Sequence, residues 1–306
     1  MLHERDSLGK ETDMTRLAAL ADIHGNLPAL QAVIDDMRQF KVDQVVVAGD
    51  SVNWGPFSRQ VLELVFQRRW ALIRGNNAFY ALDYNTIRAP DHWASFSLPP
   101  ILREQLGSDW LKAICCLPDS LSLRFVDAPP LRVFHGVPDN PWQAIFPGTA
   151  AEEVAGWLRD VRESTVICAH SHIPMERQVD RWQIFNPGSV GVPLDGQFSA
   201  SYMILDGDTK GWELAAHRRV RFDYDPLYRE FERQNFVERG GVTARLVIEE
   251  FRSARLQVHP YVLWKLKHFA DRPDDFELLR AFLELDDVSE YMPPAYRNLN
   301  GPLHRD

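Results

Sequence analysis

Five short apolar runs in this chain each end in a polar residue that can bind a metal ion, and this repeated arrangement constrains the fold more than any other feature. The runs lead into Asp22-x-His24, Gly49-Asp50, Gly75-Asn76, His135-Gly136 and His170-x-His172. A short apolar run closed by glycine and polar residues is typical of a buried strand that enters a loop. Ligands bind at the carboxyl ends of strands in layered α/β proteins, so we expect these loops to converge.

The first 80 residues alternate between strand and helix patterns, which indicates an α/β layered fold. We expect strands at residues 15–21, 41–48 and 70–73, and a helix around 59–67. Asn26 can cap another helix, whose first turn tolerates Pro28. In a strand-like register, Asp22 and His24 lie two residues apart, so their side chains are predicted to point the same way.

The chain after residue 120 is rich in strands, and this predicts two sheets packed face to face. The expected strands are 121–126, 131–134, 165–169, 182–185, 201–205 and 212–220, the last two forming a hairpin across 206–208. A helix is expected at 150–161. Residues 83–118 carry aromatic residues and prolines, which predict short helices that cover one face.

The domain boundaries follow from changes in this pattern. Residues 1–14 are polar and are predicted to form a loose tail. The layered domain is expected to span 15–223, and residues 224–306 to form a C-terminal extension of amphipathic helices. Examples are residues 244–251 and 261–269, with a break at Gly240-Gly241.

The net charge and the cysteine content indicate which binding partners and which cellular compartment suit the protein. The formal net charge is -9, which disfavours non-specific binding to nucleic acid or to an anionic membrane. We find no apolar run of about 18 residues, the length that a membrane helix needs. Only Cys115, Cys116 and Cys168 are present, which is not a disulfide framework and predicts a reducing, cytoplasmic location.

The residues at the five strand ends form a set that suits transition metals. They comprise four histidines, two aspartates and one asparagine, namely Asp22, His24, Asp50, Asn76, His135, His170 and His172. Imidazole and carboxylate donors suit Mn²⁺, Fe or Zn²⁺ better than Ca²⁺ or Mg²⁺. Seven residues are too many for one ion and fit two ions that share a carboxylate. Such pairs of ions hydrolyse phosphate esters.

In their order and spacing, these motifs resemble those of the calcineurin-like metallophosphoesterases, in particular a small bacterial and archaeal branch of phosphodiesterases. The resemblance covers roughly residues 15–220. It includes the run Asn186-Pro187-Gly188-Ser189-Val190-Gly191 as well as the five loops. It implies an α/β fold, a four-layer α/β/β/α sandwich of two mixed sheets, to which the C-terminal helical extension would be added.

The same resemblance implies a role for each residue. Asp22, His24 and His172 would hold the first metal ion, Asn76, His135 and His170 the second, and Asp50 would bridge them. Manganese is the favoured metal, with Fe, Zn, Ni and Co as alternatives. A metal-bridging hydroxide would attack phosphorus, and Asp50, Asn76, Asn77 and His135 would be the catalytic residues.

Three positions depart from the family pattern. Asn77 stands where a histidine usually contacts phosphate and protonates the leaving group, and Ala78 replaces the usual acidic residue. Asparagine can donate a hydrogen bond but not a proton, and general acid catalysis is worth about 10²–10⁴-fold. We therefore expect phosphodiesters to be favoured over alkyl phosphomonoesters. Ala169 replaces a glycine, which its backbone accommodates if φ is negative.

Structural roles compete with the catalytic ones at several positions. A single histidine is more often structural, Asp50 could cap a helix, and Asn76 or Asn77 could simply occupy a turn. His92 could replace the missing acid, although its aromatic neighbours Trp93 and Phe96 favour packing.

Residues outside the ligand set are expected to be mainly structural. Arg74 is expected to form a salt bridge, and Trp54 to pack near the pocket rim. Residues 186–189 are expected to support the His170–His172 loop. Trp264 and Phe269 suit packing or dimer contacts.

These observations predict that the protein is a cytoplasmic dinuclear metal hydrolase, which acts on a small phosphoester or nucleotide-like substrate. The alternatives are a nucleotide pyrophosphohydrolase acting on dinucleoside polyphosphates, a serine/threonine protein phosphatase, or a weakly active metal-binding scaffold. The C-terminal helices are also a candidate surface for homo-oligomerisation.

Overall fold

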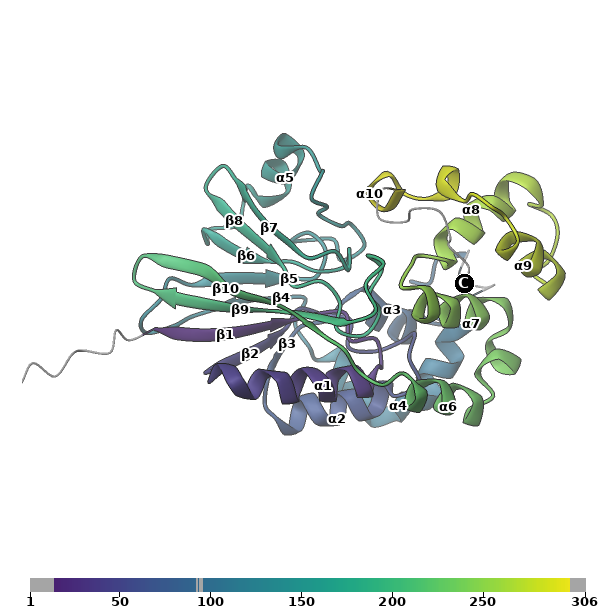
Figure 1. Ribbon diagram of the computed structural model, residues 1–306, viewed down its shortest axis with the longest axis horizontal. Helices are drawn as coiled ribbons and strands as arrows, with labels where there is room; N and C mark the ends of the chain where they lie inside the picture. Colours follow the sequence, from purple (N-terminus) through teal and green to yellow (C-terminus); the bar gives the residue numbers. More distant parts are fainter. Residues whose placement is uncertain (1–13, 92, 94–95, 298–306) are drawn as a thin grey trace, which may run out of the picture.

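Two five-stranded sheets face each other at the centre of the protein (Figure 1). This computed structural model describes residues 14–91, 93 and 96–297. The tail predicted for residues 1–14 lies outside the described residues apart from Met14, as does His92.

The first sheet has the strand order β10-β9-β1-β2-β3. Its strands are β1 (Thr15–Leu20), β2 (Gln44–Val47), β3 (Ala71–Leu72), β9 (Ala200–Asp208) and β10 (Gly211–Val220). β1, β2 and β3 are parallel, whereas β9 runs antiparallel to β1. The predicted hairpin exists, but β9 continues through the residues predicted as its turn and pairs with a strand from the start of the chain.

The second sheet has the strand order β4-β5-β6-β8-β7. Its strands are β4 (Ser120–Leu123), β5 (Leu131–Phe134), β6 (Thr165–Ile167), β7 (Met175–Val179) and β8 (Trp182–Asn186). Strands β5, β6 and β8 are parallel, and β4 and β7 form antiparallel edges. We did not predict β7, because its three central residues are polar and only its ends are buried.

The alternation of side chains along β1 explains how the layers pack. Leu17 and Ala19 face the second sheet and join the core between the sheets. Ala18 and Leu20 face the other way and pack against helices. A strand that is buried on both faces reads as a continuous apolar run, as this one does.

Helices cover the outer face of each sheet, and this confirms the predicted four-layer α/β/β/α sandwich. On the first sheet lie α1 (Leu27–Met37), which continues into η1 (Arg38–Phe40), and α2 (Ser58–Gln67); α5 (Ala151–Leu158) covers the second (Figure 1). Asn26 caps α1 as predicted, since its Oδ1 accepts from the Ala29 amide at 3.1 Å.

Two helices lie beyond β3 at one end of the sandwich, α3 (Asn76–Asp83) and α4 (Leu98–Cys115). Short helices were expected here. Accordingly, α4 consists of two shorter helical segments that meet at Gly107, whose φ of 66° and ψ of 174° are not helical. Its apolar side packs on α2 and α3.

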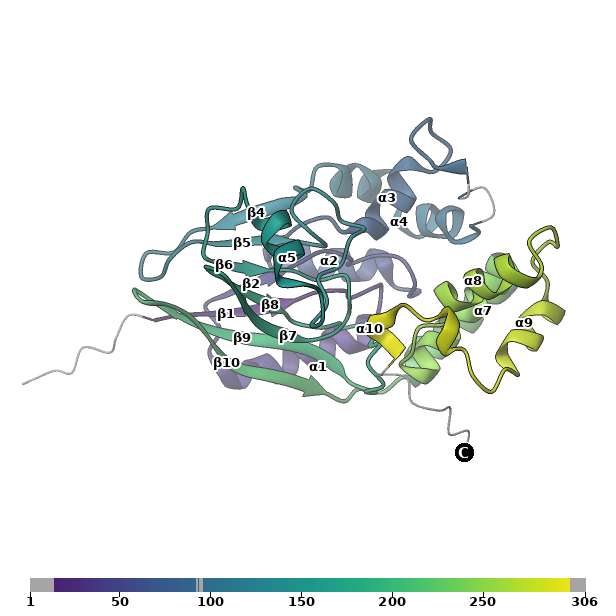
Figure 2. The ribbon, with the colours of Figure 1, turned by 90° about the horizontal axis from the view of Figure 1, so that it is seen from above.

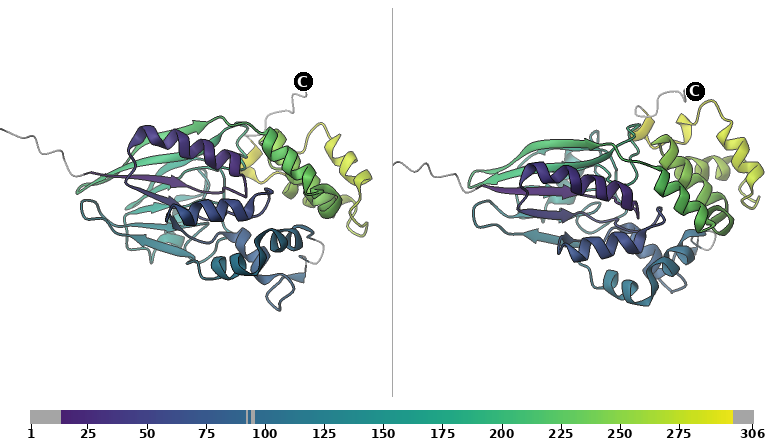
Figure 3. Two further views of the ribbon diagram at one scale, coloured as in Figure 1. Left: turned by 90° about the horizontal axis from the view of Figure 1, so that it is seen from below. Right: turned by 60° about the horizontal axis from the view of Figure 1, so that its bottom comes forward.

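The C-terminal segment is helical, as predicted. It comprises α6 (Asp225–Arg233), α7 (Phe236–Ser253), α8 (Val258–His268), α9 (Phe276–Leu283), η3 (Ser289–Tyr291) and α10 (Pro294–Arg297). The expected break lies inside α7, where Gly241 has φ 56°. This extension lies at the same end of the sandwich as α3 (Figures 2 and 3). None of the helices within the described residues has the length and apolar character of a membrane span.

Candidate metal centre

The five predicted ligand loops meet at the carboxyl ends of the parallel strands. The loops after β1 and β2 are joined by backbone hydrogen bonds, from Asp22 N to Gly49 O at 3.2 Å and from His24 N to Asp50 O at 2.9 Å. The amide of His170, after β6, reaches the same point by donating to Asp22 Oδ2 at 3.2 Å. Residues from distant parts of the sequence therefore converge as the strand ends predict.

Five of the seven predicted ligands have a left-handed backbone. The φ values are 52° for Asp22, 48° for His24, 46° for Asp50, 69° for His170 and 56° for His172. The expectation that Asp22 and His24 share a strand register is thus wrong, because β1 ends at Leu20. A non-glycine residue in this region costs roughly 1–3 kcal/mol, and such residues cluster at functional sites.

Asp22, His24 and His172 form the first ligand group. Their ligand atoms lie within 4.8 Å of one another. His24 Nε2 is 3.8 Å from Asp22 Oδ1, and His172 Nε2 is 3.5 Å from the same oxygen. The side chains come from loops 148 residues apart, which the fold brings into one buried cluster.

Asp50, His135 and His170 form the second ligand group. His135 Nε2 is 3.2 Å from Asp50 Oδ2 and 2.9 Å from Asn76 Oδ1, so Asn76 joins this group. Asp50 Oδ2 is also 3.8 Å from His24 Nε2 in the first group. Asp50 therefore lies between the two groups.

Backbone carbonyls fix which ring nitrogen of three histidines faces the centre. A carbonyl can only accept, so the nitrogen beside it carries a proton, and the other nitrogen has a lone pair when the ring is neutral. The acceptors are Ala48 for His135 Nδ1 (2.9 Å), Val192 for His172 Nδ1 (2.5 Å) and Trp142 for His170 Nε2 (3.2 Å). Metal-binding histidines use such contacts to set their orientation.

Unpartnered atoms in the cluster fit a bound cation. Asp22 Oδ1 and His24 Nδ1 are buried without a hydrogen-bond partner among the described residues. His24 Nε2 and His172 Nε2 approach each other to 3.2 Å, although the carbonyl contact of His172 leaves a lone pair on its Nε2. Buried polar atoms usually have partners. Divalent cations held by the two groups would satisfy Asp22 Oδ1 and the facing Nε2 atoms of His24 and His172.

Burial and mutual charge shift the pKa values of this cluster in opposite directions. Burial, reinforced by the charge of Asp50, raises the pKa of Asp22 to about 8. Burial lowers the pKa of His24 to about 3 and those of His170 and His172 to about 4. These three histidines are therefore neutral near pH 7, the form that binds metals.

His135 behaves differently from the other three histidines. Burial alone would lower its pKa, but the charge and hydrogen bond of Asp50 raise it to about 9. Burial likewise opposes ionisation of Asp50, yet the charge of His135 holds the pKa of Asp50 well below its usual range. Without metal, the centre thus holds a proton on His135 that an ion would displace.

Asn77 contacts Asp50 through both of its nitrogen atoms. Its backbone N lies 2.9 Å from Asp50 Oδ1, and its Nδ2 lies 2.6 Å from Asp50 Oδ2. Its Oδ1 accepts from Asn53 Nδ2 at 2.8 Å. We predicted a phosphate contact or a turn position for Asn77 and a place near the pocket rim for Asn53, but not this contact, since the sequence does not show that the two loops touch.

Gly75, which precedes the predicted ligand Asn76, has no room for a side chain. A Cβ at this position would lie 2.1 Å from Asp50 Oδ1 and 2.6 Å from the Asp50 amide nitrogen. The glycine of the Gly-Asn motif is therefore required by the close approach of the Asp50 loop.

The turn at residues 186–189 braces the ligand loops, as predicted. Asn186 Nδ2 donates to the Ala169 carbonyl at 3.1 Å and to Ser171 Oγ at 3.0 Å. Ser189 Oγ donates to the Asp22 carbonyl at 2.7 Å. Ala169 is not among the described residues with positive φ, so the replacement of glycine is accommodated.

The C-terminal extension also contacts the ligand loops, which we did not predict. Trp54 Nε1 donates to Glu250 on α7 at 2.6 Å, and the Trp54 ring lies 5.8 Å from that of His24. The Tyr296 hydroxyl on α10 donates to the Ser171 carbonyl at 2.8 Å. The partners are 196 and 125 residues apart, a separation that local patterns do not bridge.

Three residues outside the centre have the structural roles we expected. Arg74 pairs with Asp119 at 2.7 Å. Trp264 packs in the core of the extension and lies 5.2 Å from Phe269.

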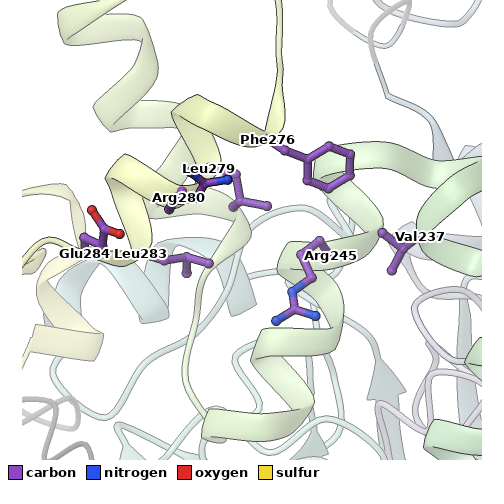
Figure 4. A pocket seen from close by; sticks show the side chains of 7 residues that line it. All are labelled: Val237, Arg245, Phe276, Leu279, Arg280, Leu283 and Glu284. Carbon is purple, nitrogen blue, oxygen red and sulfur yellow. The ribbon is translucent and has the colours of Figure 1, made fainter.

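A separate hollow of about 350 Å³ opens in the extension, between α7 and α9 (Figure 4). Its lining includes Arg245, Phe276 and Arg280 but none of the seven predicted ligands. It is therefore distinct from the metal centre.

Comparison with known proteins identifies relatives of the layered part. The sequence profile of the calcineurin-like phosphoesterase superfamily domain matches residues 15–210. An uncharacterized protein of Methanocaldococcus jannaschii is 26% identical over 252 residues, which cover 72% of this chain and 94% of that protein. Phosphodiesterase YfcE of Escherichia coli is 25% identical over 195 residues, or 64% of this chain and 89% of the enzyme.

Two crystal structures share the fold. A metallophosphoesterase from Sphaerobacter thermophilus is 23% identical with a TM-score of 0.61, covering 78% of this chain and 99% of that one. A hypothetical protein from Pyrococcus horikoshii is 19% identical with a TM-score of 0.65, covering 79% of this chain and 98% of that one.

Proposed function

Because the chain belongs to the calcineurin-like phosphoesterase superfamily and is thereby a phosphoric ester hydrolase, we propose that it is a dinuclear metal-dependent phosphodiesterase. The observation that carries this proposal is the pair of adjacent ligand groups with Asp50 between them. Two groups that share a carboxylate suit two ions, the arrangement that clamps both oxygens of a phosphoester displacement.

The donor set supports a distinct place for each ion. Asp22, His24 and His172 would hold one, Asn76, His135 and His170 the other, and Asp50 both. Imidazole nitrogens mixed with carboxylate and amide oxygens favour Mn²⁺, with Fe, Zn, Ni and Co as further candidates. When bound, such ions would lower the pKa of a water molecule and neutralise charge on the phosphoryl oxygens.

The residues of the chain position this chemistry. The carbonyls of Ala48 and Val192 hold the rings of His135 and His172, so their lone pairs stay directed at the centre. Asn77 holds the carboxylate of Asp50 from one side through two hydrogen bonds. We propose that Asn77 orients the shared ligand, which would make it a positioning residue.

This role of Asn77 bears on the choice of substrate. Its amide cannot protonate a leaving group near pH 7. An aryl or otherwise stabilised leaving group needs no proton, whereas the alkoxide of an alkyl phosphomonoester does. We therefore propose a phosphodiester with a stabilised leaving group as the substrate, and a relative of similar sequence is named a phosphodiesterase.

We further propose that residues 15–223 form the catalytic domain and residues 224–306 an extension that braces it. The partly buried hydrogen bond from Trp54 in the first part to Glu250 in the second supports these two roles. The three cysteines are free thiols, which supports a reducing, cytoplasmic location.

One assay tests the proposal. The full-length protein is loaded with Mn²⁺ and offered bis(4-nitrophenyl) phosphate, 4-nitrophenyl phosphate and diadenosine tetraphosphate. We expect metal-dependent turnover, fastest on the diester, and a loss of at least about 100-fold in Asp50→Asn, which weakens the shared ligand. No metal-dependent turnover on any of the three would overturn the proposal, and preference for diadenosine tetraphosphate would identify a pyrophosphohydrolase.

A further inference from the structure

A continuous arc of aromatic rings runs along one side of the metal centre, from the ligand His24 to the ligand His170. The successive rings are His24, Trp54, Phe96, Tyr80 and Trp142, with centroid separations of 5.8, 6.3, 4.6 and 5.2 Å. At its far end, the carbonyl of Trp142 accepts from His170 Nε2 at 3.2 Å. The arc thus begins and ends on residues of the two different ligand groups.

Helix α3 carries both a ligand and the middle of the arc. Tyr80 follows Asn76 by four residues, so the two side chains lie on the same side of the helix. Burial raises the pKa of the Tyr80 phenol, and the nearby charge of Asp50 adds to the effect. Tyr80 therefore presents a neutral ring beside the centre.

The exposure of the arc separates it from an ordinary core cluster. Trp93 is buried and packs against the arc, with its ring 4.5 Å from Tyr80 and 5.8 Å from Trp142. Trp142 is 41% exposed, and Trp54, Tyr80 and Phe96 are partly exposed. An indole backed by a second ring but open to solvent is a surface on which a planar group can stack.

We propose that this aromatic arc is the subsite for the base of a nucleotide, and that the substrate is a small nucleotide phosphoester. The base would stack on the exposed ring of Trp142, to which Tyr80 lies edge-on at 87°, while the phosphoryl group lies at the ligand groups. Base–aromatic stacking tolerates any base because every base has a π-face. The net charge of -9 disfavours binding of a nucleic acid polymer, so we propose a small nucleotide as the occupant of this subsite.

This inference rests on the proposed function and names its substrate class. The reaction is hydrolysis: water adds to phosphorus, the P–O bond to the leaving group breaks, and a nucleoside monophosphate and an alcohol or phenol are released. The product keeps the base, so its affinity reports the arc without any turnover.

The test compares two ligands that share a phosphate but differ in the base. Isothermal titration calorimetry with the Mn²⁺-loaded protein measures the affinity for thymidine 5′-monophosphate and for methyl phosphate. We expect the nucleotide to bind roughly tenfold more tightly than methyl phosphate, because stacking of one base on an aromatic ring has an effect of this size. Trp142→Ala should remove this preference, because it deletes the exposed ring but keeps the carbonyl that holds His170.

Two further variants serve as controls. Trp142→Phe keeps a ring and should retain most of the preference. Phe66→Ala removes a ring of similar exposure, 42%, that packs on Trp110 away from the centre, and should change neither affinity.

The outcomes distinguish this inference from the proposed function. Hydrolysis of thymidine 5′-(4-nitrophenyl phosphate) and of methyl 4-nitrophenyl phosphate is measured with the same protein. Turnover without any preference for the nucleotide product, or a preference that survives in Trp142→Ala, overturns the aromatic subsite alone. If the protein hydrolyses neither of the two esters, the proposed function itself is overturned.

Discussion

Asn77 holds the carboxylate of Asp50 at both oxygens, through its backbone nitrogen at 2.9 Å and its side-chain nitrogen at 2.6 Å. Both residues are buried, and Asn53 Nδ2 in turn donates to the side-chain Oδ1 of Asn77. A chain of two amides therefore fixes the orientation of the residue that lies between the two ligand groups.

Removing the side-chain contact should weaken metal binding without unfolding the protein. In Asn77→Ala we expect the affinity for Mn²⁺, measured by calorimetry, to fall about 10–100-fold, the usual effect of losing a group that orients a ligand. Asn53→Ala, which acts one step further away, should give a smaller loss. Equal affinity in Asn77→Ala and the unmodified protein would contradict this role.

Restoring the histidine of the family pattern should change the choice of substrate. In Asn77→His we expect the ratio of phosphomonoester to phosphodiester turnover to rise, because a general acid is worth about 10²–10⁴-fold for a poor leaving group. The ratio is measured on alkyl and aryl esters with Mn²⁺ present. Should it stay unchanged, the argument from the leaving group is wrong.

The stability of the metal-free protein should pass through a maximum near pH 6.5. His24, His170 and His172 have lowered pKa values of about 3 to 4, so the unfolded chain binds their protons more readily and stability rises with pH up to their ordinary pKa. Asp22 and His135 have raised pKa values of about 8 and 9. The stabilisation that protonated Asp22 and His135 provide falls as pH rises. Above pH 6.5 the three histidines no longer offset this loss, so the stability of the protein decreases.

Thermal unfolding in EDTA between pH 4 and pH 9 tests this profile. Adding Mn²⁺ should move the maximum to higher pH, because metal binding requires that Asp22 and His135 lose their protons. A metal-free melting temperature that is flat over this range would exclude the pKa values on which the prediction rests.

Glu250 should contribute far more to the free energy of unfolding than its sequence neighbour Glu249. Its buried carboxylate accepts from Trp54 Nε1 and from the amides of Gln257 and Val258. Glu250→Ala leaves these donors unpaired, and we expect a loss of about 3 kcal/mol in urea unfolding. Glu249→Ala removes only partly exposed ion pairs and should cost less than about 1 kcal/mol. Similar losses in the two variants would refute a bracing role for the extension.

Strand ends and ligand types could be predicted because they depend on local sequence. The apolar run before Asp22 and the valines before Asp50 each mark a buried strand, and the fold places their ends together. Hydrophobic periodicity also located α1 and its cap at Asn26. These features need only near neighbours in the chain.

Other features could not be predicted because they depend on distant partners. Strand β7 has a polar centre and forms only because β8 pairs with it, and β9 joins the first sheet by pairing with β1. The left-handed backbone of Asp22 and His24 is set by hydrogen bonds to the neighbouring loop. Such contacts leave no periodic signal.

The contacts of the extension set an order of events during synthesis. Ser171 precedes its partner Tyr296 by 125 residues, and Trp54 precedes Glu250 by 196. Domains emerging from the ribosome fold from the amino end onward. We expect the ligand loops to leave the ribosome before the helices that hold them in place, so that full metal affinity develops only once the extension has been translated and has docked.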